Sequence, residues 1–289
     1  MGTIATIGFF DGVHRGHQLV LKRLVEEAKL HDSQSMVVTF SNHPKQDMPL
    51  LNTLDERIER IKQQGVDSIQ LLQFEQVKHL TAKEFMQEML IEKLHVDCLL
   101  MGYDHRFGSD QITDFRIYQA IADSIGLKVI NLPQYAPHGH HISSSTIRTL
   151  IDMGEIDDAN QLLGYNYSIE GHVVEGRHIG RQLGFPTANI TPLDEKKLIV
   201  GAGVYVARVY SAHEQNGRLG MLNVGTNPTV GGIQNTIEVH ILDFDKQLYG
   251  EKIKIEIIHR LRGEIKFNTL DQLRRQLEKD KQQCLNYKL

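Results

Sequence analysis

A stretch near the amino terminus, Gly8 to His17 with the sequence GFFDGVHRGH, most constrains how this chain can fold. It joins an apolar run typical of a strand to a segment whose apolar residues recur with helical spacing. We therefore expect His14 and His17 in a strand-to-helix turn, on one face of the helix start. Free backbone N–H groups and the helix dipole favour a phosphate there, and Gly12 and Gly16 would let a triphosphate approach the backbone. The pattern predicts the phosphate-reactive site of a nucleotidyltransferase, although an isolated histidine pair is more often a surface feature.

Strand and helix patterns alternate up to about Leu163, which predicts a parallel sheet covered on both faces by helices. The expected strands are Thr3–Phe9, Met36–Phe40, Ser68–Leu72, Val96–Met101 and Leu127–Asn131. The expected helices are Gln18–Leu30, Thr53–Gln64, Thr81–Leu94 and Asp114–Ser124, followed by a short pair, Ile147–Met153 and Ile156–Leu163. Two of these helices begin with a capping box, Thr53 with Glu56 and Thr81 with Glu84.

Ligands of such sheets bind beyond the carboxyl ends of the strands, so the segments that follow the strands are candidate sites. SNHP follows the second strand and contains His43, and GYDHRFG follows the fourth and contains Asp104. A plain turn with a solvated ion pair fits GYDHRFG equally well.

The segment HISSSTIR, after the fifth strand, carries good N-cap residues at a helix start. Its hydroxyls and N–H groups, with Arg148 one turn on, would form a second anion site for the β- and γ-phosphates of a nucleotide. The alternative is a helix cap and nothing more.

Beyond Gly164 the pattern changes to short alternating segments rich in β-branched residues, which predict a small antiparallel barrel. The expected strands are Tyr167–Val174, Gly203–Tyr210, Leu219–Val224, Thr236–Phe244 and Lys252–Ile258. The segment Thr269–Cys284 reads as a closing amphipathic helix whose charged residues form a solvated face.

The second chemical pattern is GRHIGRQLGFPTANI, residues Gly176 to Ile190. Thr187 and Asn189 are two apart, so in extended chain they project to the same side and could hold Mg²⁺. A polar hairpin loop before an edge strand is the alternative. Glu238 favours the functional interpretation, because a carboxylate in an otherwise apolar strand is costly unless it is paired or used as a general base.

Together, GFFDGVHRGH, GYDHRFG and ISSSTIR resemble the adenylyltransferase module of prokaryotic bifunctional riboflavin kinase/FAD synthetases. The remaining residues resemble the kinase module of that family. The resemblance implies a Rossmann-like α/β nucleotidyltransferase domain over residues 1–163 and a β-barrel riboflavin kinase domain with a C-terminal helix over 164–289. It also implies two reactions with ATP, phosphorylation of riboflavin to FMN and adenylylation of FMN to FAD with release of pyrophosphate.

With this resemblance, we expect His14, His17, Arg148 and Glu238 to be catalytic, and Mg²⁺ to bind at Thr187 and Asn189. The nucleotide- and phosphate-binding residues would be Gly8, Phe9, Asp11, Gly12, Gly16, His43, Asp104, Ser144, Thr146, Gly176, Arg181, Gly184, Phe185, Pro186 and Thr187. ATP is expected as a co-substrate, and FMN and FAD as substrate and product.

Composition limits the partners. The formal net charge of −4 argues against a general nucleic-acid binder, and no apolar run is long enough to span a membrane. Neither a leader pattern nor a metal-ligand or disulfide spacing of Cys98 and Cys284 is found, so we expect a cytoplasmic enzyme of small-molecule substrates. We expect a monomer or a weak homo-oligomer.

Three alternatives remain open from the sequence. The chain could be a member of the same family with one active module. It could be a nucleotidyltransferase for another substrate, such as a pantetheine or nicotinate nucleotide. It could also be a non-catalytic flavin-binding or regulatory protein.

Overall fold

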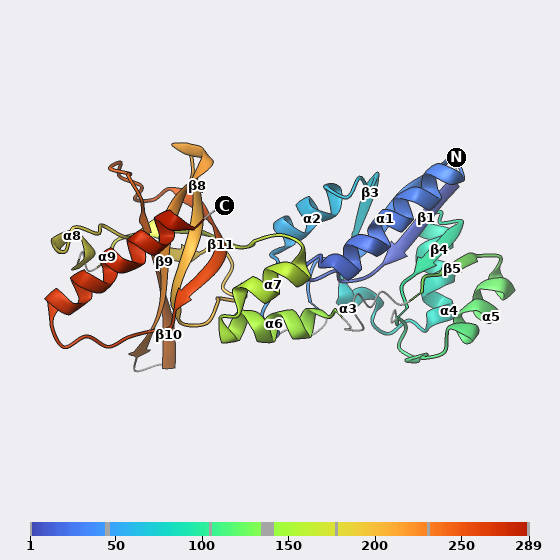
Figure 1. Cartoon of the computed structure of the whole chain (residues 1–289). Helices are drawn as coiled ribbons and strands as arrows, with labels where there is room; N and C mark the ends of the chain where they lie inside the picture. The colour runs from blue at the N-terminus through green and yellow to red at the C-terminus, as the bar shows by residue number, and fades with distance from the viewer. Residues whose placement is uncertain are drawn as a thin grey trace. The chain divides into compact units, whose positions relative to one another are not determined.

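The computed structural model describes residues 2–43, 47–103, 106–133, 142–176, 179–229 and 232–287, and the side chains of residues 179, 226–229 and 232–235 are not described. Two compact units make up the chain, Met1–Ser144 and Ser145–Leu289 (Figure 1). The short helical pair, which we expected to close the first domain, thus belongs to the second unit. The boundary between residues 163 and 164 stays a prediction.

The first unit is built on a parallel five-stranded sheet in the order β3-β2-β1-β4-β5. The strands are β1 (Gly2–Ile7), β2 (Ser33–Phe40), β3 (Ser68–Leu72), β4 (Cys98–Met101) and β5 (Lys128–Asn131). The helices are α1 (Arg15–Leu30), α2 (Leu54–Lys62), α3 (Phe74–Val77), α4 (Ala82–Glu84), η1 (Phe85–Lys93) and α5 (Phe115–Ile125). This is the expected Rossmann-like arrangement, and it is confirmed.

Helices bury both faces of this sheet because side chains alternate along each strand. Ile4 and its neighbours on one face pack against α1 and α2, through Leu21, Leu24 and Ile61. Ala5 and its neighbours on the opposite face pack against η1 and α5, through residues that include Phe85, Met86, Leu90, Tyr118 and Ala122. A sheet covered in this way leaves only its ends accessible to a ligand.

Both predicted capping boxes are present, Thr53 with Glu56 at α2 and Thr81 with Glu84 at α4. The helix expected over Thr81–Leu94 differs, however, because after one α-turn it continues as the π-helix η1. There the amide of Leu94 donates to the carbonyl of Met89, five residues earlier. Apolar spacing predicts a helix but does not distinguish its hydrogen-bond period.

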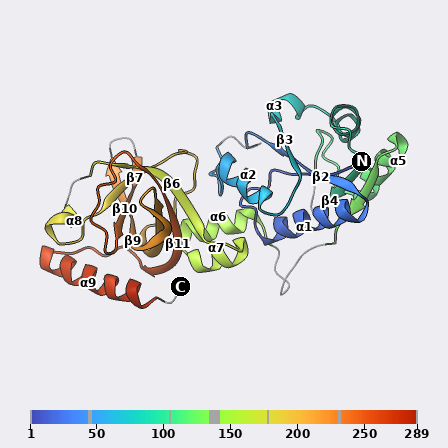
Figure 2. The same cartoon turned by 90° about the horizontal axis from the view of Figure 1, so that it is seen from above.

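The second unit contains a closed antiparallel barrel in the order β10-β7-β6-β11-β8-β9 (Figure 2). Its strands are β6 (Tyr167–Val174), β7 (Ala188–Pro192), β8 (Gly203–Ser211), β9 (Glu214–Thr229), β10 (Gly232–Ile241) and β11 (Lys252–Arg262), and a short helix, α8 (Ile179–Gln182), precedes β7. The expected barrel is confirmed, with β7 as a sixth strand at the segment that we expected only to be extended.

Helix α9 (Leu270–Asn286) lies along the outside of the barrel and confirms the expected closing helix (Figure 2). Leu277 and Cys284 pack on the cluster around Val206. The expectation of a purely solvated charged face is wrong at Asp280, which is fully buried. Its carboxylate receives a fork of hydrogen bonds from Arg262 of β11, with the closest at 2.8 Å. A buried charge of this kind requires such a partner.

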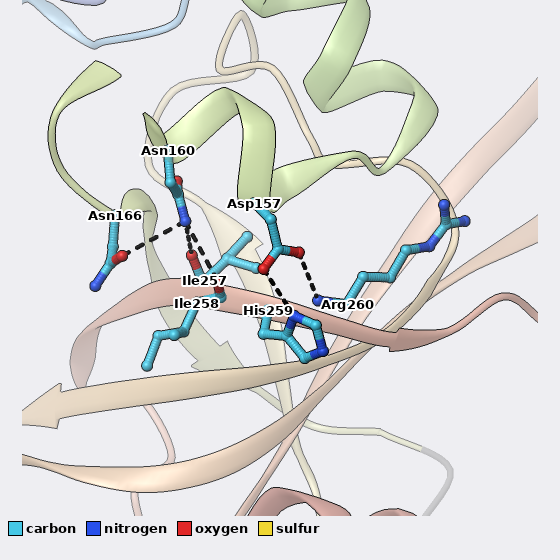
Figure 3. A network of polar contacts seen from close by, with 7 residues as sticks. All are labelled: Asp157, Asn160, Asn166, Ile257, Ile258, His259 and Arg260. Atoms are coloured by element: carbon cyan, nitrogen blue, oxygen red, sulfur yellow. Dashed lines mark hydrogen bonds and ion pairs between the residues drawn. The ribbon is translucent and has the colours of Figure 1, made fainter. Parts of the chain in front are cut away.

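Helix α6 (Ser144–Met153) is followed by α7 (Ile156–Leu163), which docks on β11 through a polar network (Figure 3). Asn160 donates to the carbonyl of Ile257 at 2.9 Å and accepts from the amide of Tyr167 at 2.7 Å. Asp157 contacts the Nδ1 atom of His259 at 2.7 Å. The β8–β11 register shifts between Ile257 and His259, so these side chains occupy the irregular part of the strand.

Within the described residues, no helix combines the length and the apolar character that crossing a bilayer requires.

We predict that Asn160→Ala lowers the free energy of unfolding by about 1–3 kcal/mol, because it leaves a buried backbone acceptor and a buried donor without their partner. Urea unfolding followed by far-UV circular dichroism measures this. Asn268→Ala, an identical substitution at an exposed asparagine before α9, is the control and should leave stability unchanged. Equal stability of the two variants would contradict the role of Asn160.

Candidate active sites

The turn between β1 and α1 has an unusual backbone. Phe10, Gly12 and Val13 have positive φ angles of 55°, 80° and 34°. Glycine adopts this region without strain, but a β-branched residue such as Val13 does so rarely and at a cost. Such outliers persist where the surrounding structure imposes them, often at functional sites. The turn lies at the carboxyl end of β1, where ligands of parallel sheets bind.

His14 and His17 lie together at the start of α1, as predicted. His14 is the N-cap, and its Nδ1 atom accepts from the amide of His17 at 3.3 Å. The two imidazole rings stack, with centroids 3.6 Å apart. The expected role of Gly16 in letting a phosphate approach stays a prediction, and an added Cβ at this glycine would lie 3.2 Å from the His14 ring. Its small size therefore leaves room for the histidine cap.

Asp11 organises the turn from a buried position, with a side chain that is 3% exposed. Its carboxylate accepts from the amides of Leu51 and Asn52, each at 3.1 Å. Its carbonyl accepts from the Ser144 hydroxyl at 2.9 Å. Asp11 and Ser144 were both predicted as phosphate-binding residues, and in the structure they brace each other through this bond. Gly8, also predicted, continues the sheet by donating to the Val38 carbonyl.

Phe9 and His43 pack edge to face at the same end of the sheet, with ring centroids 4.4 Å apart. The guanidinium of Arg57 lies over the Phe9 ring at 3.9 Å and donates to the carbonyl of Phe40. Burial lowers the pKa of Arg57 to about 10, and the negative charge of Asp11 opposes that shift. Arg57 is therefore charged at neutral pH although it is 1% exposed.

Sequence reasoning missed Arg57. A signal was present, because Leu54, Arg57, Ile58 and Ile61 share helical spacing and so place an arginine on the apolar face of α2.

The remaining residues predicted for this site fall in three places. Ser144 begins α6, whereas Thr146 and Arg148 lie further along that helix, in the second compact unit. Thr146 is exposed and Arg148 is partly buried. Asp104 lies outside the described residues, so its expected role stays a prediction.

Two neighbouring strands hold the second candidate site. Glu238 of β10 is paired directly with Asn189 of β7. The hydroxyl of Thr187, just before β7, donates to Oε2 of Glu238 at 3.3 Å. Thr187, Asn189 and Glu238 are partly buried, and the structure brings all three together, as the sequence pattern requires.

The glycine-rich loop adjoins these residues. A Cβ on Gly176 would lie 1.9 Å from the Asn189 amide nitrogen. Any side chain at position 176 would therefore displace the Asn189 amide from its observed position. Arg181 is exposed on α8, and Gly184 ends the turn after it with a φ of 85°. Phe185 is buried in the cluster around Val206, while Pro186 is exposed beside it.

The hydroxyl oxygen of Thr187 and the amide oxygen of Asn189 are hard donors, which suit Mg²⁺ in company with water and phosphate oxygens. Among the side chains that the structure describes, no group of three or more His, Cys, Asp or Glu residues could hold a metal ion by itself.

We predict that Arg57→Met lowers the free energy of unfolding by about 1–3 kcal/mol, because the partly buried Phe40 carbonyl loses its donor. Arg57→Lys is the matched variant, since it keeps a charge and a donor and should lose less. Urea unfolding of the full chain compares them. A methionine variant as stable as wild type would show that the guanidinium does not support the turn.

Comparison with known proteins matches one family model to each half of the chain. A family model described as FAD synthetase matches residues 1–146, and one described as riboflavin kinase matches residues 163–288. A bifunctional riboflavin kinase/FMN adenylyltransferase of Escherichia coli K12 is 35% identical over 286 residues, covering 96% of this chain and 90% of that protein. The enzymes of that name from Listeria monocytogenes and Bacillus subtilis are 37% and 34% identical, covering 96% and 99% of this chain and 90% and 92% of their own.

A solved structure described as a macrolide-efflux protein from Streptococcus pneumoniae matches with a TM-score of 0.90 and 32% identity, covering 99% of this chain and 95% of that one. Its description differs in kind from those of the other relatives, whereas its fold is shared along nearly the whole chain. With both family models matched in order and relatives covered over nine-tenths of their length, this chain belongs to the bifunctional riboflavin kinase/FMN adenylyltransferase family.

Proposed function

We propose that this protein converts riboflavin to FAD in two steps, each of which consumes ATP. The first step phosphorylates riboflavin to FMN in the barrel unit, and the second transfers AMP to FMN in the parallel-sheet unit, releasing pyrophosphate. The observation that carries the proposal is the cluster of Glu238, Asn189 and Thr187 on adjacent strands, within the segment matched by the riboflavin kinase model.

In the kinase step, Glu238 is the general base. Its carboxylate accepts the proton of riboflavin's terminal hydroxyl as that oxygen attacks the γ-phosphate of ATP and ADP leaves. The bond from Thr187 holds the carboxylate in place before the substrate binds. Placing a nucleophile and its base in a fixed geometry lowers the entropic part of the barrier.

Thr187 and Asn189 are the residues that would hold Mg²⁺, through a hydroxyl and an amide oxygen. When bound, this ion neutralises phosphate charge. The small residue at position 176 keeps the Asn189 amide next to the loop that would cover the phosphates. The roles of Arg181, Gly184, Phe185 and Pro186 are to shape that loop and to supply charge.

In the adenylyltransfer step, the FMN phosphate attacks the α-phosphate of ATP. His14 and His17 stabilise the developing charge together with the N–H groups of the α1 start. Ser144, Thr146 and Arg148 hold the leaving pyrophosphate. Phe9, Asp11, Gly12 and His43 shape the nucleotide site, and Asp104 positions the nucleotide or the flavin phosphate.

We further propose a cytoplasmic protein, monomeric or weakly self-associating, whose partners are these small molecules and not nucleic acid. Its kinase domain begins near residue 164. A family member with a single active module is the main alternative, and product analysis distinguishes the two.

The test follows FMN and FAD over time after mixing the protein with riboflavin, ATP and Mg²⁺. FMN should rise and then convert to FAD. His17→Ala should stop at FMN, because the phosphate charge is no longer stabilised. Glu238→Gln should form neither product from riboflavin yet still make FAD from supplied FMN.

Each variant thus serves as the control for the other unit. Wild-type protein that accumulates FMN without FAD, or that makes FAD only from supplied FMN, would favour the single-module alternative.

A further inference from the structure

His240 is the next outward-facing residue after Glu238 on β10, and it has no role in the reaction described above. Its Nδ1 atom lies 2.7 Å from the carbonyl oxygen of Pro186. A carbonyl can only accept, so the ring nitrogen must carry the proton and donate it. Burial lowers the pKa of His240, and the hydrogen bond to the Pro186 carbonyl opposes that shift.

This bond continues the seam between β7 and β10 beyond its backbone ladder. The paired positions are Glu238 with Asn189 and Val239 with Ala188. In the same register the next pair would join His240 and Thr187, but β7 begins only at Ala188. There the His240 side chain bonds to the backbone instead, at the carbonyl of Pro186, the residue before Thr187.

The segment is fixed from a second side by Phe185. Its ring is buried in the cluster around Val206, which Leu277 and Cys284 of α9 also join, and it meets the His240 ring edge to face, with centroids 5.4 Å apart. Pro186 thus follows a buried residue, Phe185, and its own carbonyl is hydrogen-bonded to His240. Both of these contacts restrict the backbone that carries the Thr187 hydroxyl.

We propose that His240 is a positioning residue of the kinase site. Its Nδ1–H group holds the Pro186 carbonyl and so sets the distance between the Thr187 hydroxyl and the Glu238 carboxylate. The inference rests on the proposed kinase function of that site. The His240 side chain makes two contacts that can be tested separately: its N–H donates to the Pro186 carbonyl, and its ring packs on Phe185.

Two substitutions isolate these contacts. His240→Asn retains an N–H donor near the position of Nδ1 but removes the ring, whereas His240→Phe retains the ring and removes the donor. His172→Ala changes an exposed histidine of β6 and is the control. Steady-state rates of FMN formation at varied Mg·ATP and at varied riboflavin are measured for each variant, with FAD formation from supplied FMN and thermal unfolding alongside.

We expect His240→Phe to lower kcat/KM for Mg·ATP in FMN formation by about tenfold or more, since small misplacements of binding groups have effects of this size. Its KM for riboflavin and its FAD formation from FMN should match wild type. His240→Asn should recover most of the lost rate even if it unfolds at a lower temperature. The control should behave as wild type.

Wild-type rates in His240→Phe would overturn the inference, as would equal impairment of the Phe and Asn variants, which would assign the effect to ring packing. Wild-type protein that forms no FMN would instead overturn the proposed function and this inference with it. The two failures are therefore distinguishable in one set of assays.

Discussion

The satisfied burial of the Asp11 carboxylate is the constraint on which the first site depends. A buried carboxylate needs hydrogen-bond donors, and Asp11 finds them in the amides of Leu51 and Asn52. This requirement fixes the entry to α2 against the β1–α1 turn and brings Arg57 over Phe9. The positive φ angles of the turn are then maintained by partners distant in the sequence. The histidine cap depends on that turn, so one buried charge supports the geometry of the whole site.

The two units arrange groups for phosphate chemistry by different means. The parallel sheet ends its strands at one edge, so its site relies on backbone N–H groups and a helix start beside His14. The antiparallel barrel has no such edge. Its site is made from side chains on adjacent strands, where register alone sets Asn189 opposite Glu238. In both units, a glycine leaves space for a polar side chain of the proposed site, Gly16 for His14 and Gly176 for Asn189.

Much of this architecture could be predicted from the sequence because its signals are local. Capping boxes, strand runs and the histidine turn depend on neighbouring residues, and they are found where expected. Arg57 was missed and Asp280 was wrongly expected to be solvated, because a charge on a helix is buried or exposed according to what the rest of the chain brings to it. The docking of α7 on β11 likewise depends on Asn160 meeting an irregular strand far along the chain.

The short seam between β7 and β10 has a consequence for motion. Local opening of a folded chain starts where few backbone hydrogen bonds have to break. The ladder here covers Glu238–Val239, whereas β10 pairs with β9 along its whole length. Among the barrel strands, amide exchange with solvent should therefore be fastest along this junction, where β7 and β10 can separate while the other strands stay paired. The strands that open first are those that carry Thr187 and Glu238, so closing the barrel and assembling its polar cluster are a single event.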